Sequence, residues 1–87
     1  MEIRYHKHFL KRFKKLSPDL KEKTISTIRR FTKNPRDPCL RNHGLKGRLA
    51  GKRAFWITGD VRIIFEEFEG YILVILLDIG THNQVYN

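Results

Sequence analysis

Hydrophobic and polar residues follow different periods in the two parts of this 87-residue chain. From His6 to Leu16, and again between Pro18 and Asn34, apolar side chains recur every three or four positions, which predicts two amphipathic helices. A short strand over Ile3–Tyr5 precedes them. The last third is rich in Ile, Val, Phe, Trp and Tyr between turn residues, and it predicts strands over residues 53–57, 61–67 and 71–79.

The two helices carry specific boundary and core signals. Ser17 can cap the second helix, Pro18 suits its first position, and Asp19 meets the positive end of the helix dipole. Asn34-Pro35 ends this helix. We expect the buried stripes to consist of Phe9, Leu10, Phe13 and Leu16 in the first helix, and of Leu20, Thr24, Ile25, Ile28 and Phe31 in the second.

The order of the elements indicates one α+β domain over residues 1–87. An N-terminal strand is followed by an αα-hairpin, a loop-like basic segment from Pro35 to Arg53, and three closely spaced strands. These strands predict an antiparallel meander with the helices packed on one sheet face. The run Tyr71–Ile79 is apolar at nearly every position, so it is expected to be the central strand, covered on both faces.

Charge is distributed very unevenly along the chain. The whole sequence has 18 Lys and Arg against 9 Asp and Glu, a net charge of +9. Residues 1–53 hold 17 of those cations and 4 of the acids, a net of +13, so the rest of the chain is acidic. Such crowding of like charge favours an anionic partner, most commonly nucleic acid, although a solvated basic surface is the alternative.

The chain shows no sign of secretion or of a membrane span. Its single cysteine, Cys39, cannot form a disulfide within the chain, which favours a reducing cytoplasm. The N-terminus lacks the apolar region of a signal peptide. The longest apolar run, Tyr71–Leu77, is too short to cross a bilayer.

Four positions could carry chemistry, and each has an ordinary structural alternative. His82 follows the last strand with Tyr86 beyond it, but it could simply be exposed in a terminal turn, since Thr81 and Gln84 have capping-box spacing. His43 lies alone in the basic loop. Asp60 could orient a histidine or merely close the hairpin.

Arg62 is the fourth candidate, in the middle of a predicted strand. A cation there costs desolvation unless it is paired or faces a polar groove. It could therefore form an ion pair with Glu66 or Asp78, or it could bind an anion.

Together these residue types suit RNA cleavage without a metal ion. The 2′-hydroxyl of RNA can attack the adjacent phosphorus if the protein supplies a base, an acid for the leaving oxygen, and cations for the charge that develops. Histidines, an aspartate, a tyrosine and arginines provide these groups. His6 and His8 have no companion Cys or Asp cluster, so neither a metal nor another cofactor is expected.

Four short motifs occur in order in the second half of the chain. They are Asn42-His43-x-Leu45-x-Gly47, Gly51-x-Arg53, Asp60-x-Arg62-x-Ile64, and Gly80-Thr81-His82 with an aromatic residue four positions on. In these motifs and their spacing the chain resembles the RelE/ParE superfamily of toxins from toxin–antitoxin pairs, and within it the YafQ-like messenger-RNA interferases.

This resemblance implies a RelE-like fold, a cognate antitoxin as partner, and cleavage of messenger RNA on the ribosome. It implies a catalytic site made of His43, Asp60, Arg62, His82 and Tyr86, in which Arg62 contacts the scissile phosphate and Tyr86 is the terminal aromatic residue that holds a base. The surrounding residues expected to bind RNA are Arg41, Lys46, Arg48, Lys52, Arg53 and Trp56. Trp56 stands where the YafQ-like branch has another histidine, and Val61 where it has an aromatic residue; Trp56 could stack on a base instead.

Two other functions fit parts of the pattern. A non-enzymatic inhibitor of DNA gyrase, like the ParE branch, would use a similar scaffold, but the pair His43 and His82 argues against it. A basic RNA-binding module with a degenerate catalytic site is favoured by the missing third histidine. The sequence does not indicate which histidine is the base.

Overall fold

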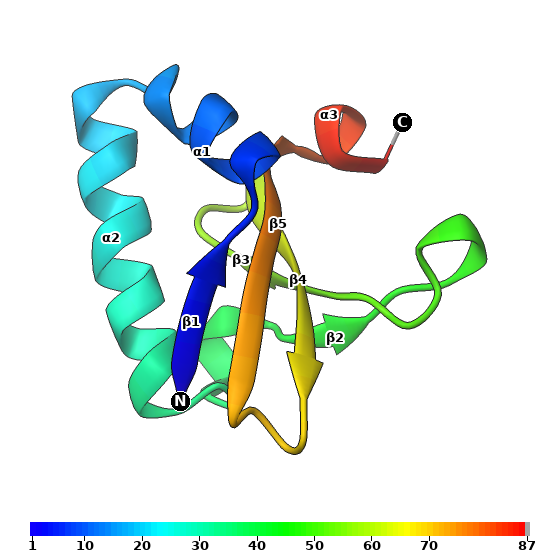
Figure 1. Ribbon diagram of the computed structural model, residues 1–87. Coiled ribbons are helices and arrows are strands. Elements are labelled where there is room, and N and C mark those ends of the chain that lie inside the picture. Colours follow the sequence, from blue (N-terminus) through cyan, green and yellow to red (C-terminus); the bar gives the residue numbers. More distant parts are fainter. Residues whose placement is uncertain (87) are drawn as a thin grey trace.

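A five-stranded sheet separates two layers of helix in the computed structural model, which describes residues 1–86 (Figure 1). Helices α1 (Lys7–Lys14) and α2 (Pro18–Lys33) cover one face. The short helix α3 (His82–Tyr86) and the loop of residues 45–52 project from the other side of the sheet. The strands are β1 (Glu2–Tyr5), β2 (His43–Gly44), β3 (Arg53–Trp56), β4 (Val61–Phe68) and β5 (Leu73–Thr81), and single 3₁₀ turns lie at Pro38–Leu40 and Gly47–Leu49.

The sheet has the strand order β1-β5-β4-β3-β2. Strands β3, β4 and β5 form the predicted antiparallel meander, and β1 pairs in parallel with β5. Strand β5 is therefore interior and not at an edge, but the central place expected for it is held by β4. Strand boundaries differ from the prediction by one or two residues, and one strand was not expected. Tyr71 has a left-handed φ of 71°, so β5 starts at Leu73. Residues His43–Gly44, predicted as loop, form an edge strand because β3 supplies their hydrogen-bonding partners.

The main core lies between the sheet and the two long helices. Phe31 is fully buried and stacks on Phe55 with ring centroids 4.4 Å apart, while Phe65 meets Phe31 edge-on. Thr24 is also fully buried, and its hydroxyl donates to the Leu20 carbonyl at 2.7 Å, which satisfies it without a partner outside the helix. Aromatic packing therefore fixes the helical layer on the sheet.

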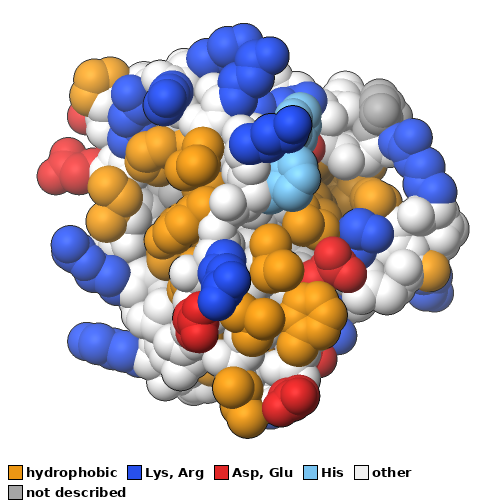
Figure 2. Space-filling model, viewed as in Figure 1, with side chains coloured by type: hydrophobic (Ala, Val, Ile, Leu, Met, Phe, Trp, Pro, Cys, Tyr) orange, Lys and Arg blue, Asp and Glu red, His pale blue; other side chains and the backbone are white. Residues whose placement is uncertain are grey.

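The predicted buried faces of the two helices included two residues that are exposed in the structure. Leu10 and Ile25 are each 43% exposed, whereas the expectation placed both in the core. Phe9 on α1 and Thr24 on α2 occupy the sides that face the sheet, so the residues that follow them, Leu10 and Ile25, turn outward. Figure 2 shows hydrophobic side chains at the surface between the helices and β1, with Lys and Arg side chains around this face.

A second, smaller apolar cluster lies on the opposite sheet face. Ala54 of β3 and Ile64 of β4 are buried there against Val85 of α3, and Leu45 and Tyr86 pack at its margin. This cluster holds both α3 and the 45–52 loop onto the sheet. Within residues 1–86, no helix is long and apolar enough to span a bilayer.

Candidate functional site

An open groove of about 310 Å³ lies between α3 and the basic loop. Four of the five predicted catalytic residues line it, and they come from separate parts of the chain: His43 from β2, Arg62 from β4, and His82 and Tyr86 from α3. The remaining lining residues are Leu45, Lys46 and Leu49. Folding thus gathers two imidazoles, a guanidinium and a phenol around one surface hollow.

His43 is oriented by the main chain of the loop before it. Its Nδ1 lies 2.7 Å from the carbonyl oxygen of Arg41. A carbonyl only accepts hydrogen bonds, so Nδ1 carries the proton and Nε2 of the neutral ring keeps its lone pair. Arg41 itself has a left-handed φ of 51° and ends the 3₁₀ turn of residues 38–40, which directs its carbonyl toward the imidazole.

Arg62 is held by contacts with its own hairpin. Its Nη2 donates to the Gly59 carbonyl at 3.0 Å, and its Cζ lies 5.0 Å from the centre of the Trp56 ring, directly across the β3–β4 pair. The ion pair considered from the sequence does not form. Asp78 instead lies 3.5 Å from His8 Nε2 and from Arg12 Nε, and Arg62 has no carboxylate partner within the described residues.

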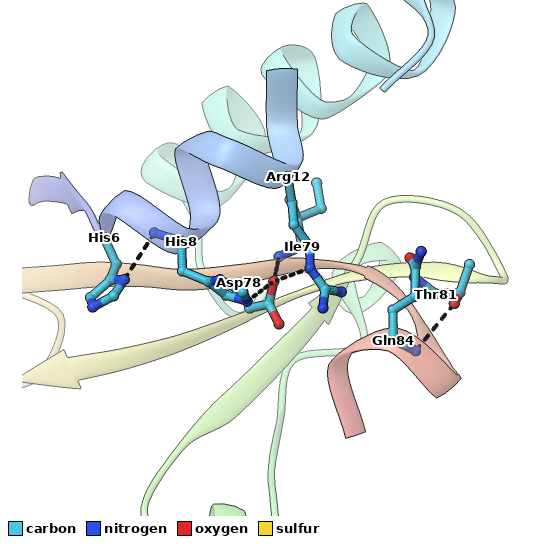
Figure 3. Close-up of polar contacts among 7 residues, drawn as sticks. All are labelled: His6, His8, Arg12, Asp78, Ile79, Thr81 and Gln84. Atoms are coloured by element: carbon cyan, nitrogen blue, oxygen red, sulfur yellow. Dashed lines mark hydrogen bonds and ion pairs between the residues drawn. The ribbon is translucent and has the colours of Figure 1, made fainter. Parts of the chain in front are cut away.

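Helix α3 is fixed at both of its ends. At its start the capping box predicted from the spacing is present: the Thr81 N–H donates to Gln84 Oε1 at 2.9 Å, and the Gln84 N–H donates to Thr81 Oγ1 at 3.3 Å (Figure 3). At its end Arg48 Nη2 donates to the Tyr86 carbonyl at 2.6 Å. The terminal turn therefore exists, and it presents His82 to the groove.

His82 and Tyr86 form a pair on the groove-facing side of α3. Their ring centroids lie 4.4 Å apart in an edge-to-face arrangement. The Tyr86 hydroxyl is buried and has no hydrogen-bond partner among residues 1–86. Because its ring lies against the imidazole, Tyr86 limits how far the His82 ring can rotate.

Near the junction of β5 with α3, a side chain of α1 packs against β5. Figure 3 shows Arg12 of α1 pointing down to Asp78 of β5, two residues before Gly80. A Cβ atom on Gly80 would lie 2.6 Å from Gln84 Oε1 and 3.0 Å from Arg12 Nη1, so only glycine fits without displacing these groups. The sequence indicated the capping box and placed Gly80 in a motif, but it did not indicate the contact with Arg12, because nothing local shows that α1 reaches the start of α3.

Several predicted site residues lie elsewhere. Asp60 is exposed in the β3–β4 turn and is not among the groove-lining side chains. Arg53 faces away: its Nε donates to Asn42 Oδ1 at 3.0 Å, and it lines a separate cavity with Tyr71. Lys52 lies at the base of the 45–52 loop, half-buried and outside the groove lining.

The four other predicted RNA-binding residues, Arg41, Lys46, Arg48 and Trp56, have distinct surroundings. Lys46 lines the groove. Arg48 donates a hydrogen bond to the Tyr86 carbonyl at the end of α3. Trp56 has two guanidinium groups over its ring, that of Arg62 and that of Arg41, whose Cζ lies 4.8 Å from the ring centre. Across the described residues, no three His, Cys, Asp or Glu side chains gather in a way that could hold a metal ion.

Among models of known protein families, one matches this chain. The model of the family described as bacterial toxin of type II toxin–antitoxin system, YafQ, matches residues 1–87. The structure is similar to that of YafQ from E. coli strain BL21(DE3), with a TM-score of 0.82 and 20% identity over 99% of this chain and 98% of that chain. No curated protein sequence matches the chain significantly.

Two further solved structures have the same fold. The YoeB/ParE toxin from Agrobacterium tumefaciens is similar with a TM-score of 0.77 and 18% identity, over 94% of this chain and 99% of that chain. A chain of the E. coli DinJ–YafQ complex is similar with a TM-score of 0.70 and 21% identity, over 99% and 98%. The RelE-like α+β fold expected from the motifs is therefore confirmed. Because the family model spans the whole chain, this protein belongs to the YafQ family of toxins from bacterial type II toxin–antitoxin systems.

Proposed function

We propose that this toxin is a metal-independent endoribonuclease that cuts messenger RNA on the ribosome and so stops translation in the cytoplasm. The observation that supports this most directly is the convergence of His43, Arg62, His82 and Tyr86 on one open groove. An open groove suits a strand of RNA better than an enclosed pocket would. Its groups match the base, acid and cation that cleavage through the 2′-hydroxyl requires.

The two histidines take different roles in this proposal. His43 is the base, because its Nδ1–H is held by the Arg41 carbonyl and its Nε2 can accept the proton of the 2′-hydroxyl. His82 is the acid that protonates the 5′-oxygen as the bond to phosphorus breaks, and the edge of Tyr86 holds its ring in place. The products are a 2′,3′-cyclic phosphate and a free 5′-hydroxyl, so no water enters the bond-breaking step.

Arg62 stabilises the negative charge that collects on the phosphorane. Its guanidinium is always charged, is fixed by Gly59 and Trp56, and has no carboxylate partner in the described part of the chain. A preorganised cation of this kind lowers the barrier because it needs no rearrangement as the charge develops. Lys46 adds a second positive charge at the groove.

The antitoxin is proposed to bind on the other side of the molecule. A hollow of about 250 Å³ between α1, α2 and β1 is lined only by apolar side chains, those of Tyr5, Phe9, Leu10, Phe13, Ile25 and Ile28. Leu10 and Ile25 are exposed there, and helical spacing of three or four residues puts cations beside them at Lys7, Lys14, Lys21 and Arg29. An acidic amphipathic helix matches this surface in both apolarity and charge.

Mapping messenger-RNA ends on translating ribosomes tests the proposal. The purified toxin should produce new ends within coding sequence, with a cyclic phosphate on one side and a 5′-hydroxyl on the other. A chelator that removes transition metals but spares the magnesium of the ribosome should leave the rate unchanged. A message with a 2′-deoxy sugar at the cleaved position should stay intact. Intact messages together with inhibited DNA gyrase would support the ParE-like alternative, and binding without either effect would support a degenerate RNA-binding module.

A further inference from the structure

Trp56 lies where an RNA-facing aromatic residue was expected, but protein groups already occupy its ring. The Cζ atoms of Arg41 and Arg62 lie 4.8 and 5.0 Å from the ring centre, so the two charges are at most about 10 Å apart, the sum of these distances. Neither arginine forms an ion pair with a carboxylate of residues 1–86. Two uncompensated cations that would otherwise repel each other are thus gathered by one neutral ring.

The contacts of the two arginines make this arrangement specific. Arg62 pairs directly across from Trp56 in the β3–β4 ladder, and its Nε is buried without an acceptor in the described residues. The ring's negative face partly offsets the cost of burying that guanidinium. Arg41 approaches from the loop, and its own carbonyl orients His43.

We infer that Trp56 is a positioning residue, which holds Arg41 and Arg62 as a paired site for RNA phosphates and does not itself stack on a base. Arg62 reaches the groove, and Arg41 extends the positive charge beyond it, so the pair suits successive phosphates of one strand. The inference rests on the proposed function for the identity of the anion. In this inference Trp56 affects RNA binding only because it positions Arg41 and Arg62.

Binding of a fluorescein-labelled 2′-O-methyl RNA oligonucleotide, which cannot be cut, tests this by anisotropy. Trp56→Leu should weaken binding roughly 2- to 30-fold, the range that a cation–π contact is worth. Trp56→Phe, which keeps an aromatic face, should restore most of that loss. In an Arg41→Ala/Arg62→Ala background, Trp56→Leu should have no further effect. In a Lys46→Ala background its effect should persist, because Lys46 lines the groove without touching the ring.

Two further measurements separate the possible outcomes. Trp56 is the single tryptophan of the chain, so Arg62→Ala should shift its fluorescence emission without any RNA, whereas Lys46→Ala should not. Thermal melts of each variant exclude unfolding as the cause of weak binding. An equal loss from Trp56→Leu in the parent and in the arginine-free background would mean that the ring contacts RNA directly, and no loss at all would equally overturn the inference. Neither result depends on cleavage, so failure of the ribosome assay alone would reject only the proposed function.

Discussion

Replacing Gly80 by alanine should slow cleavage markedly while lowering the free energy of unfolding only slightly. The added Cβ would meet Gln84 Oε1 at 2.6 Å, Arg12 Nη1 at 3.0 Å and Gln84 Cβ at 3.1 Å. The first two atoms end flexible side chains and can move aside. Gln84 Cβ belongs to the frame of α3, so the helix itself must shift by a few tenths of an ångström.

The stability cost follows from the bond that is given up. When the Gln84 amide swings away, the Thr81 N–H loses its 2.9 Å partner in the capping box. Loss of such a cap costs about 1 kcal/mol, which lowers the melting temperature of a domain of this size by roughly 4–8 °C. The variant should therefore still be folded at 25 °C.

The activity cost is expected to be larger, because α3 carries His82 into the groove. Misplacement of a catalytic group by about 1 Å can lower a rate about 100-fold, so a smaller shift should lower cleavage roughly 10- to 100-fold. Gln84→Ala loses the same cap without the clash, and comparing the two variants separates displacement of α3 from loss of the bond.

Gly59→Ala is the matched control for this experiment. Gly59 lies in the β3–β4 turn with nothing within 4 Å of an added Cβ, and its φ is outside the left-handed range. Single-turnover cleavage on ribosomes and thermal melts should be measured for the parent and all three variants. If Gly80→Ala cleaves as fast as Gly59→Ala, the position of α3 is not what sets the rate and our account of how His82 is presented is wrong.

Four other outcomes follow from the site and its surroundings. His82→Ala should slow cleavage about 10²- to 10⁴-fold with the fold and antitoxin binding intact; a rate within about threefold of the parent would move the acid role to another group. Arg62→Ala should cost about 10²- to 10³-fold, and less than the product of both effects when combined with His82→Ala; simple multiplication of the two losses would indicate independent roles. Leu10→Asp should weaken antitoxin binding at least about tenfold while cleavage persists, whereas Ser26→Asp, exposed on α2 outside the apolar hollow, should change neither; equal effects would contradict the proposed docking surface. Affinity for RNA should fall steeply as salt rises, because neutralised phosphates release counterions, and a flat response would exclude a phosphate-led interface.

Features that depend on local pattern were predictable from the sequence. The helix start at Ser17, the meander of β3 to β5 and the interior place of β5 follow from capping residues and from periodicity, and all are confirmed. The strand phase of Arg62 likewise pointed it away from the main core and toward the groove face. These signals are local because each depends on neighbours a few residues away.

Features that depend on distant partners were not predictable in this way. Strand β2 exists only because β3 lies beside it, and no propensity of His43–Gly44 indicates a strand. The charge of Arg48 suggested an RNA contact, but its partner is a carbonyl 38 residues later in the chain. Trp56 is similar: the sequence indicates an aromatic residue in a basic region, and only the fold shows that two arginines cover it.

The parallel pairing of β1 with β5 has a consequence for how the toxin is made. Glu2 pairs with Leu73, so the first strand to be synthesised has no partner until almost the whole meander has emerged from the ribosome. His82 and Tyr86 emerge later still. Contacts this far apart in sequence form slowly, since the intervening chain must first be closed into a loop. Co-translational folding therefore cannot assemble the groove on the nascent chain until β5 and α3 have left the ribosome.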